Sequence, residues 1–119
     1  MKQAETLKKN YEFRRLYQKG ASAAGGCLVI YCRKNRAGRN RLGLTTSMKL
    51  GNAVTRNRLR RRMREVYRLN AGQLRQGYDV ILVARTRTLT APWKEMNATF
   101  FRLCKKLNLL RDEPPRTAL

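Results

Sequence analysis

The chain has 119 residues, of which 28 are lysine or arginine and 7 are aspartate or glutamate, so its formal net charge is +21. Its length suits one domain with a modest core, and its 42% hydrophobic content is above that of a disordered basic tail. The charge favours a polyanionic partner, nucleic acid rather than an anionic membrane, because the sequence has no lipidation signal and no long apolar span. We expect a single domain over residues 1–119, with an ordered core at about 7–110 and a flexible tail at 111–119.

The first predicted element is a short helix. Asn10 is a good N-cap residue, and the helical pattern continues to about Lys19. Phe13, Leu16 and Tyr17 share one face of this helix, at i, i+3 and i+4 spacing. The next residues, "ASAAGG", are small and typical of a turn.

Three segments after that turn have the composition of β-strands. "CLVIYCR" at 27–33 is β-branched and aromatic, "RLGLTTS" lies at 41–47, and "YDVILVA" at 78–84 has the continuous apolar pattern of a strand buried on both faces. Alternation along the first segment places Leu28, Ile30 and Cys32 on one face and Cys27, Val29, Tyr31 and Arg33 on the other.

Two more helices are predicted. A long helix separates the second and third strands, from about Ala53 to Leu74, with Asn52 or Thr55 as its cap, and the last helix follows Thr90. Their core stripes are Leu59, Met63, Val66, Tyr67 and Leu74, and Trp93, Met96, Phe100, Leu103 and Leu107. The order α-β-β-α-β-α predicts an α+β two-layer sandwich with its helices on one face of a small mixed sheet. Because the long helix connects the second and third strands, we expect these two strands to be parallel. By default, such a crossover connection is right-handed.

The long helix carries an unusual density of positive charge, in the stretch "AVTRNRLRRRMR". Six of the nine residues at 56–64 are arginine, and no acidic residue lies between Glu12 and Glu65. On a helical wheel, one sector beside the core stripe holds Asn57, Arg60, Arg61, Arg64 and Arg68, while Arg58 and Arg62 lie further round and Arg56 lies in the first turn. Each buried apolar side chain contributes about 1.5–3 kcal/mol, whereas each like-charge pair costs a few tenths, so the helix tolerates the charge. A helix face that only needs to be solvated would carry charges of both signs. We therefore interpret this purely positive sector as a phosphate-binding surface.

The sequence argues against a protein-borne active site or metal site. It has no histidine, so neither a Ser–His nor a Cys–His pair can form, and its acidic residues are scattered. Cys27, Cys32 and Cys104 have no metal-binding spacing and are expected to be reduced, buried thiols. The start "MKQAETLKKN" lacks the apolar region of a signal peptide, so we expect a cytoplasmic protein.

Three aromatic residues are candidate platforms for single-stranded RNA bases, namely Phe13, Tyr17 and Tyr31. If the helices cover the Leu28 face of the sheet, the Tyr31 face borders an open groove. The alternative from the sequence is that Phe13 and Tyr17 only pack the first helix on the sheet.

The segment "KLGNAVTRNRLRRRMRE" closely resembles the signature of the bacterial ribonuclease P protein component, K-[IL]-G-x-A-x-x-R-N-R-x-[KR]-R-x-x-R. The positions that match are Lys49, Gly51, Ala53, Arg56, Asn57, Arg58, Arg60, Arg61 and Arg64. "KNYEF…YQKG" is similar to the family's first helix, "RLGLTTS" to its second strand and "YDVILVAR" to its third, so the resemblance runs from about Leu7 to Leu107.

This resemblance implies a fold that differs from the default. Family members have an α-β-β-β-α-β-α type of order with a left-handed βαβ crossover through the arginine helix, as in the second domain of ribosomal protein S5. We therefore expect a left-handed crossover and one additional strand within residues 20–41.

The resemblance also implies a division of labour. Ribonuclease P removes the 5′ leader of precursor tRNA, and its catalytic RNA subunit holds the reaction centre and most of the required Mg²⁺, so no catalytic or metal-binding residue is expected in the protein. The expected partners are the catalytic RNA and precursor tRNA, with neither DNA nor a membrane. Carried over, the residues that bind the catalytic RNA are Lys49, Arg56, Asn57, Arg58, Arg60, Arg61, Arg64 and Arg68. Those of the leader-binding cleft are Phe13, Tyr17, Val29, Tyr31 and Arg33.

Three other interpretations compete with this one. A basic ribosomal protein would share the size and charge but would need neither the motif spacing nor an aromatic groove. A DNA-binding recognition helix is usually a short member of a helix-turn-helix rather than a crossover between strands. A stand-alone nuclease is disfavoured by the absence of histidine and of clustered acids.

Overall fold

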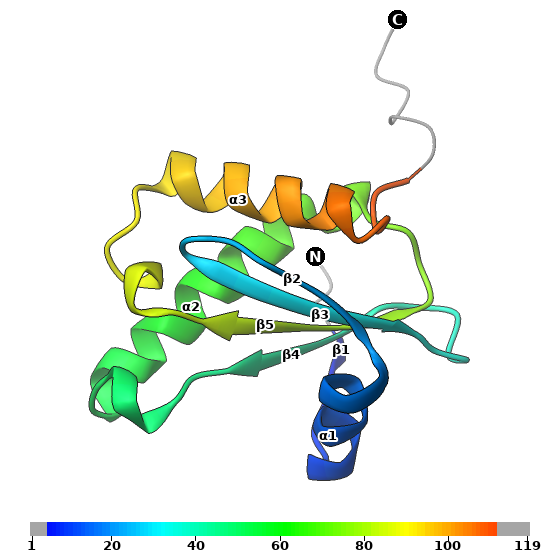
Figure 1. Ribbon diagram of the computed structural model, residues 1–119, viewed down its shortest axis with the longest axis horizontal. Coiled ribbons are helices and arrows are strands. Elements are labelled where there is room, and N and C mark those ends of the chain that lie inside the picture. Colours follow the sequence, from blue (N-terminus) through cyan, green and yellow to red (C-terminus); the bar gives the residue numbers. More distant parts are fainter. Residues whose placement is uncertain (1–4, 112–119) are drawn as a thin grey trace, which may run out of the picture.

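The computed structural model describes residues 5–111, which form a five-stranded mixed sheet and three α-helices (Figure 1). The elements in chain order are β1 (Glu5–Thr6), α1 (Asn10–Lys19), β2 (Ala21–Ala24), β3 (Leu28–Lys34), β4 (Arg41–Thr45), α2 (Ala53–Asn70), β5 (Tyr78–Ala84) and α3 (Trp93–Lys106). Short 3₁₀ turns at Met48–Leu50 (η1), Ala71–Gln73 (η2) and Thr86–Thr88 (η3) join several of them. The tail predicted to be flexible lies, apart from Arg111, outside the described residues.

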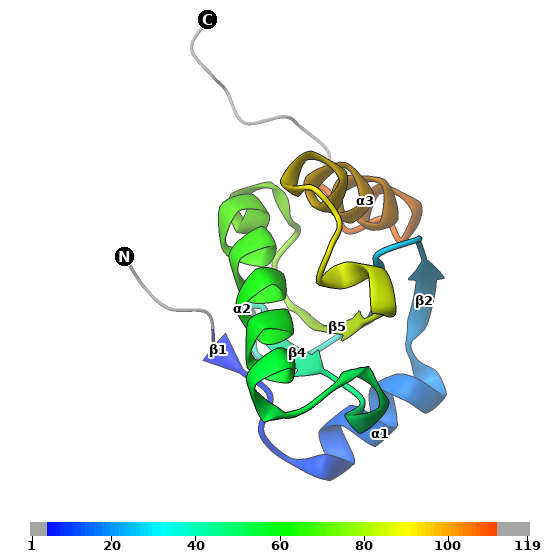
Figure 2. The same cartoon turned by 90° about the vertical axis from the view of Figure 1, so that its left-hand side faces the viewer.

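The strand order across the sheet is β1-β4-β5-β3-β2. β4 and β5 are parallel, as predicted, and β3 pairs antiparallel with both β5 and β2. Figure 2 looks along β4 and β5 from their carboxyl ends, and the chain passes clockwise from β4 through α2 to β5. A clockwise path toward the viewer is left-handed, so the default right-handed connection is wrong and the family's left-handed crossover is confirmed.

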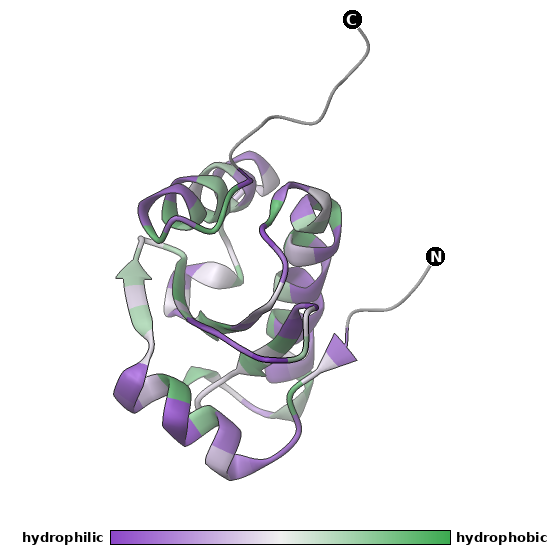
Figure 3. Cartoon of the chain, turned by 90° about the vertical axis from the view of Figure 1, so that its right-hand side faces the viewer, coloured by the Kyte–Doolittle hydropathy of each residue, from purple (hydrophilic) through white to green (hydrophobic). Residues whose placement is uncertain are grey.

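The main core lies between the sheet and the pair α2 and α3. Leu28, Ile30 and Cys32 of β3 point into it, and so do Val80 and Leu82 of β5. From the helices come the predicted stripe residues, of which Leu59, Met63, Val66, Tyr67, Leu74, Met96, Phe100 and Leu103 are buried and Trp93 and Leu107 are partly buried. Hydrophobic residues therefore concentrate on the strands and on the helix faces turned toward them (Figure 3).

The prediction that all helices cover one face is wrong for α1. Leu7 and Leu16 form a second buried cluster with Ile81, on the opposite face of the sheet from α2 and α3. Figure 1 shows α1 on the other side of the sheet. The physical reason is that β5 alternates large apolar residues toward both faces, so a helix on each face is needed to cover them.

Three local predictions also need correction. β2 is the additional strand that the resemblance placed within residues 20–41, whereas its small residues indicated only a turn. α1 begins at Asn10 instead of being capped by it, because the Glu12 carboxylate accepts hydrogen bonds from the backbone N–H groups of Lys8 and Lys9. Cys27 lies before β3 begins and is buried in the main core, not on the Tyr31 face.

Candidate nucleic-acid interface

The arginine helix α2 is held in place by its apolar stripe and by its cap. The Asn52 side chain accepts a hydrogen bond from Thr55 N at 2.9 Å, which caps the first turn. Leu59, Met63 and Val66 are each at most 1% exposed, so this face of α2 is buried in the core. The cations consequently project from the remaining sectors.

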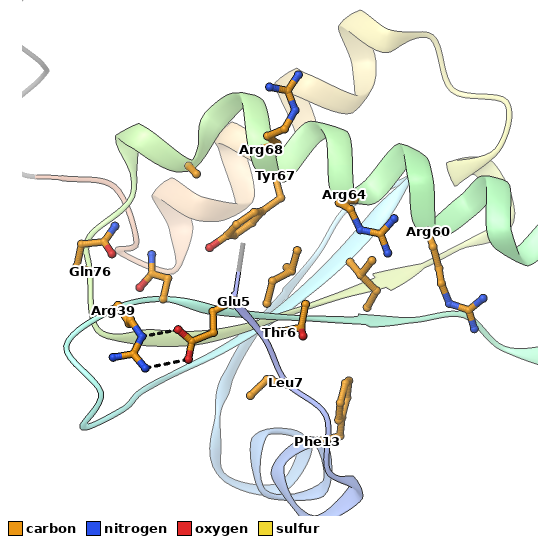
Figure 4. A pocket seen from close by; sticks show the side chains of 14 residues that line it. Glu5, Thr6, Leu7, Phe13, Arg39, Arg60, Arg64, Tyr67, Arg68 and Gln76 are labelled. Atoms are coloured by element: carbon orange, nitrogen blue, oxygen red, sulfur yellow. Dashed lines mark hydrogen bonds and ion pairs between the residues drawn. The ribbon is translucent and has the colours of Figure 1, made fainter. Parts of the chain in front are cut away.

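Three of these arginines line one cavity. Arg60, Arg64 and Arg68 line a pocket of about 1270 Å³, spaced one helical turn apart. Phe13 and Leu7 lie on its other side, and the floor between comes from β4 and Tyr67 (Figure 4). The combination of a cationic rim and an apolar floor suits a flexible polyanion with flat apolar bases.

The pocket arginines have few acidic partners among the described residues. Arg68 pairs with Glu65 at 2.6 Å, and this hydrogen bond lowers the pKa of the Glu65 carboxyl. Arg60 donates a hydrogen bond of 3.1 Å to the Asn57 side-chain oxygen, which orients the Arg60 guanidinium without neutralising its charge. Arg60 and Arg64 therefore keep their positive charge available to a ligand, whereas Arg39, which also lines the pocket, pairs with Glu5.

The other predicted RNA-binding residues do not line the pocket. Lys49 is exposed in the turn η1, and Arg58 and Arg61 are exposed on other sectors of α2. Arg56 is half-buried in the first turn, and its Nε is buried with no hydrogen-bond partner among the described residues. These side chains extend the cationic surface around and beyond the N-terminal turns of α2.

Arg62 has a structural role that the sequence did not indicate. Its guanidinium donates to the backbone oxygens of Thr88 and Leu89 at 2.7 Å and of Ala91 at 2.6 Å, and it lies 5.9 Å from the Trp93 ring centroid. Arg62 thereby fastens the η3 turn to α2. Charge pattern alone does not distinguish it from its neighbours, because these carbonyl groups come from a segment 26–29 residues away.

Two of the predicted leader-binding aromatics meet on the open part of the sheet, on the α1 side. The Tyr17 and Tyr31 rings pack edge to face with centroids 4.9 Å apart, and the Tyr17 hydroxyl shares a 2.5 Å hydrogen bond with the Thr45 hydroxyl. Beside them, Thr45, Val83 and Val29 are successive cross-strand neighbours and all are half-buried. This surface offers aromatic edges above an apolar strip, and Arg33 lies further along β3 on the same face.

Phe13 connects this aromatic surface with the pocket. It packs against the cluster of Leu7, Leu16 and Ile81, which also supports Tyr31. Its ring lies against Gly43 of β4 so closely that an added Cβ there would be 2.8 Å from Phe13 Cε2. Glycine at this position thus provides the space in which the ring sits.

An ion-pair network fixes α1 relative to the sheet. Arg41 donates two hydrogen bonds of 2.8 Å to the buried Asp79 carboxylate and one of 3.0 Å to Glu12. The hydrogen bonds that Arg41 donates to Asp79 raise the pKa of Arg41 against its desolvation. Burial opposes ionisation of Glu12, but hydrogen bonds from the Lys9 and Lys8 backbone and the Arg41 charge leave the pKa of Glu12 lowered. The network positions the residue that precedes Phe13.

The described residues offer no set of groups for metal binding or protein catalysis. No cluster of three histidine, cysteine or acidic residues occurs in this part of the chain. Burial raises the pKa of the Cys32 thiol to about 11 and that of Cys104 to about 12, so both stay protonated and unreactive at neutral pH. All three cysteines are buried and free, as predicted. None of the helices within residues 5–111 is long and apolar enough to span a membrane.

An arginine-lined pocket beside an aromatic sheet face, built on a left-handed βαβ unit, defines a nucleic-acid-binding α+β protein. Comparison with known proteins identifies the family: the Ribonuclease P family model matches residues 1–108. The ribonuclease P protein component of Natranaerobius thermophilus is 46% identical over 93% of this chain and 96% of its own length, and that of Alkaliphilus oremlandii is 43% identical over 92% and 96%. The chain therefore belongs to the ribonuclease P protein component family, whose members are subunits of the ribonuclease P endoribonuclease and act in tRNA processing.

Solved structures agree with this assignment. The ribonuclease P protein of Staphylococcus aureus superposes with a TM-score of 0.79 at 31% identity, covering 92% of this chain and all of that one. The protein from Thermotoga maritima gives a TM-score of 0.76 at 27% identity, with 86% and 96% covered. The mixed α+β fold of this chain is thus the fold of the family.

Proposed function

We propose that this subunit binds the catalytic RNA of ribonuclease P through α2 and holds the 5′ leader of precursor tRNA along the surface formed by the pocket and the aromatic face. The observation that carries the proposal is that Arg60, Arg64 and Arg68 line a pocket whose opposite side is formed by Phe13. The RNA subunit would perform the cleavage, in the cytoplasm.

Docking of a structured RNA suits the outward cations of α2. A rigid helix presents guanidinium groups at defined intervals, and each can form two parallel hydrogen bonds with a phosphate. The proposed contacts with catalytic RNA come from Lys49, Arg56, Asn57, Arg58, Arg60, Arg61, Arg64 and Arg68. The exposed position of Arg58, Arg61 and Arg64 leaves them accessible to a partner as large as an RNA helix.

A single-stranded leader suits the aromatic surface. Unpaired bases stack on aromatic rings, and the ring edges of Tyr17 and Tyr31 border an apolar strip that includes Val29. Phe13 and Arg33 complete the proposed leader contacts. Mature tRNA lacks the leader, so these contacts would favour precursor over product.

Catalysis is assigned to the RNA because the acidic groups in the described part of the protein are already engaged. Within residues 5–111, Glu5, Glu12, Glu65, Asp79 and Glu95 each pair with an arginine. A carboxylate paired with arginine is a poor ligand for Mg²⁺, so the described residues do not fit a metal site. The Mg²⁺ of the holoenzyme is proposed to be held mainly by RNA.

The test of this function is the binding of the catalytic RNA by a variant with Arg60→Ala and Arg64→Ala. Removing one phosphate-binding arginine should lower the slope of log affinity against log salt by about 1, so the double variant should bind more weakly and with a slope lower by about 2. Lys105→Ala with Lys106→Ala on α3 removes the same charge elsewhere and should leave the slope nearly unchanged. Equal slopes for both double variants would contradict the assigned role of α2.

A further inference from the structure

Besides the arginine helix α2, the helix α1 also has a positively charged surface, and the proposed function does not use it. Tyr11, Arg14, Arg15, Gln18 and Lys19 are all exposed and follow one another at i, i+3, i+4, i+7 and i+8 spacing, so they form one stripe. We call this stripe the outer face of α1. It points away from the buried Leu16, and Figures 1 and 3 show α1 standing out from the sheet with hydrophilic residues along it.

The outer face carries an aromatic ring that the core does not need. Tyr11 is 52% exposed, although α1 already buries Leu16 and packs Phe13 against the sheet. Two cations flank the ring, with Lys9 Nζ 5.8 Å and the Arg15 guanidinium carbon 6.0 Å from its centroid. A base that displaces these flexible side chains from over the ring can stack on Tyr11, and their charges are then free to pair with the flanking phosphates.

The acidic residues nearby are turned away from this surface. Glu12, the one acid of α1, points to Arg41 and to the backbone of Lys8 and Lys9. Glu5 of the preceding strand pairs with Arg39. The charged side chains of the outer face and the adjoining Lys8 and Lys9 are therefore all cationic, and the first turn of α1 adds its positive helix dipole.

We propose that the outer face of α1 is a second binding site for single-stranded RNA, occupied by leader nucleotides that lie upstream of those on the aromatic face. This inference rests on the proposed function, since it extends the leader path. Continuity on the molecule supports it: Tyr17 and Phe13 on one side of α1 belong to the proposed leader surface, and Tyr11 lies on the other side of the same helix. A strand leaving the first surface reaches the second by passing around α1.

The experiment uses the reconstituted holoenzyme and precursor tRNAs whose unstructured uridine leaders are lengthened one nucleotide at a time. For the wild-type protein, affinity should rise in two stages, first as the leader covers the Tyr17–Tyr31 surface and again when it reaches Tyr11. Tyr11→Ala, and separately Arg14→Ala with Arg15→Ala, should remove the second stage, a loss of about fivefold or more, and keep the first. These side chains are exposed, so the variants should keep the wild-type melting temperature.

The matched control is Lys105→Ala with Lys106→Ala, which removes two exposed charges from α3. Both stages should survive in this control. The inference is overturned if the wild-type protein shows no second stage, if the outer-face variants retain it, or if they weaken short and long leaders alike by weakening the catalytic RNA complex. The proposed function fails separately if the first stage is absent or survives Tyr31→Ala.

Discussion

The contact between Gly43 and Phe13 gives a sharp test of how α1 is seated on the sheet. Gly43→Ala would place a Cβ 2.8 Å from Phe13 Cε2, 2.9 Å from Phe13 Cζ and 3.2 Å from Ile81 Cγ1. The first two distances are well inside van der Waals contact, so the ring has to move. Overpacking of this kind typically costs about 1–3 kcal/mol of unfolding free energy.

The ring of Phe13 can be removed to isolate the clash. In a Phe13→Ala background, the two closest contacts of the added Cβ are gone and alanine lowers the chain entropy of the unfolded state, so the effect of Gly43→Ala on stability should be near zero. The double-mutant cycle, measured by urea unfolding, should therefore show that Phe13→Ala removes most of the cost of about 1–3 kcal/mol that Gly43→Ala has in the wild-type protein.

Gly72→Ala is the control, because nothing lies within 4 Å of a Cβ at that position. It should change stability by less than about 0.5 kcal/mol. Additive effects of Phe13→Ala and Gly43→Ala would refute the close seating of the ring. In the holoenzyme, Gly43→Ala should also weaken precursor tRNA binding, because Phe13 lines the proposed leader path.

Three other outcomes are expected. Tyr31→Ala should weaken binding of precursor tRNA about fivefold or more while sparing mature tRNA, and equal losses for both would contradict the leader surface. The pKa of Glu12 is lower in the folded state than its unfolded-state value near 4.5, so ionised Glu12 stabilises the fold at pH values above 4.5. This stabilisation is lost as the pH falls through the folded-state pKa. Glu12→Gln should consequently be less stable than wild type at about pH 7, with the gap closing as the pH falls below 4.5; a gap in urea unfolding that is independent of pH would be inconsistent with this role. Arg62→Ala should cost about 1–3 kcal/mol by leaving backbone oxygens of the η3 turn without donors, whereas exposed Arg58→Ala should be near neutral; equal melting temperatures would argue against the Arg62 contacts.

The elements with strong local signals could be predicted from the sequence. β5 occupies the predicted residues, and α2 begins at Ala53 as expected, although it gives way to a 3₁₀ turn after Asn70. β2 has only alanine and serine, which carry no β-strand signal, and it forms because its backbone pairs with β3 from Ala21 opposite Cys32 to Ala24 opposite Val29. Only the family resemblance indicated a strand there.

The site could be predicted in part. The helical wheel grouped Arg60, Arg64 and Arg68, and the structure brings them to one pocket, because α2 keeps regular geometry throughout. The seat of Phe13 on Gly43 could not be predicted, since it depends on how α1 crosses β4. For the same reason, the position of α1 on the second face of the sheet was missed.

The most direct test of the central claim is cleavage of precursor tRNA at low Mg²⁺ by the protein alone, by the catalytic RNA alone and by both together. The account predicts efficient cleavage at the leader junction only for the combination, because the protein contributes binding surfaces and the RNA the reaction centre. Cleavage by the protein alone would contradict that division. Tight RNA binding without any gain in cleavage would mean that the arginine helix serves a different RNA.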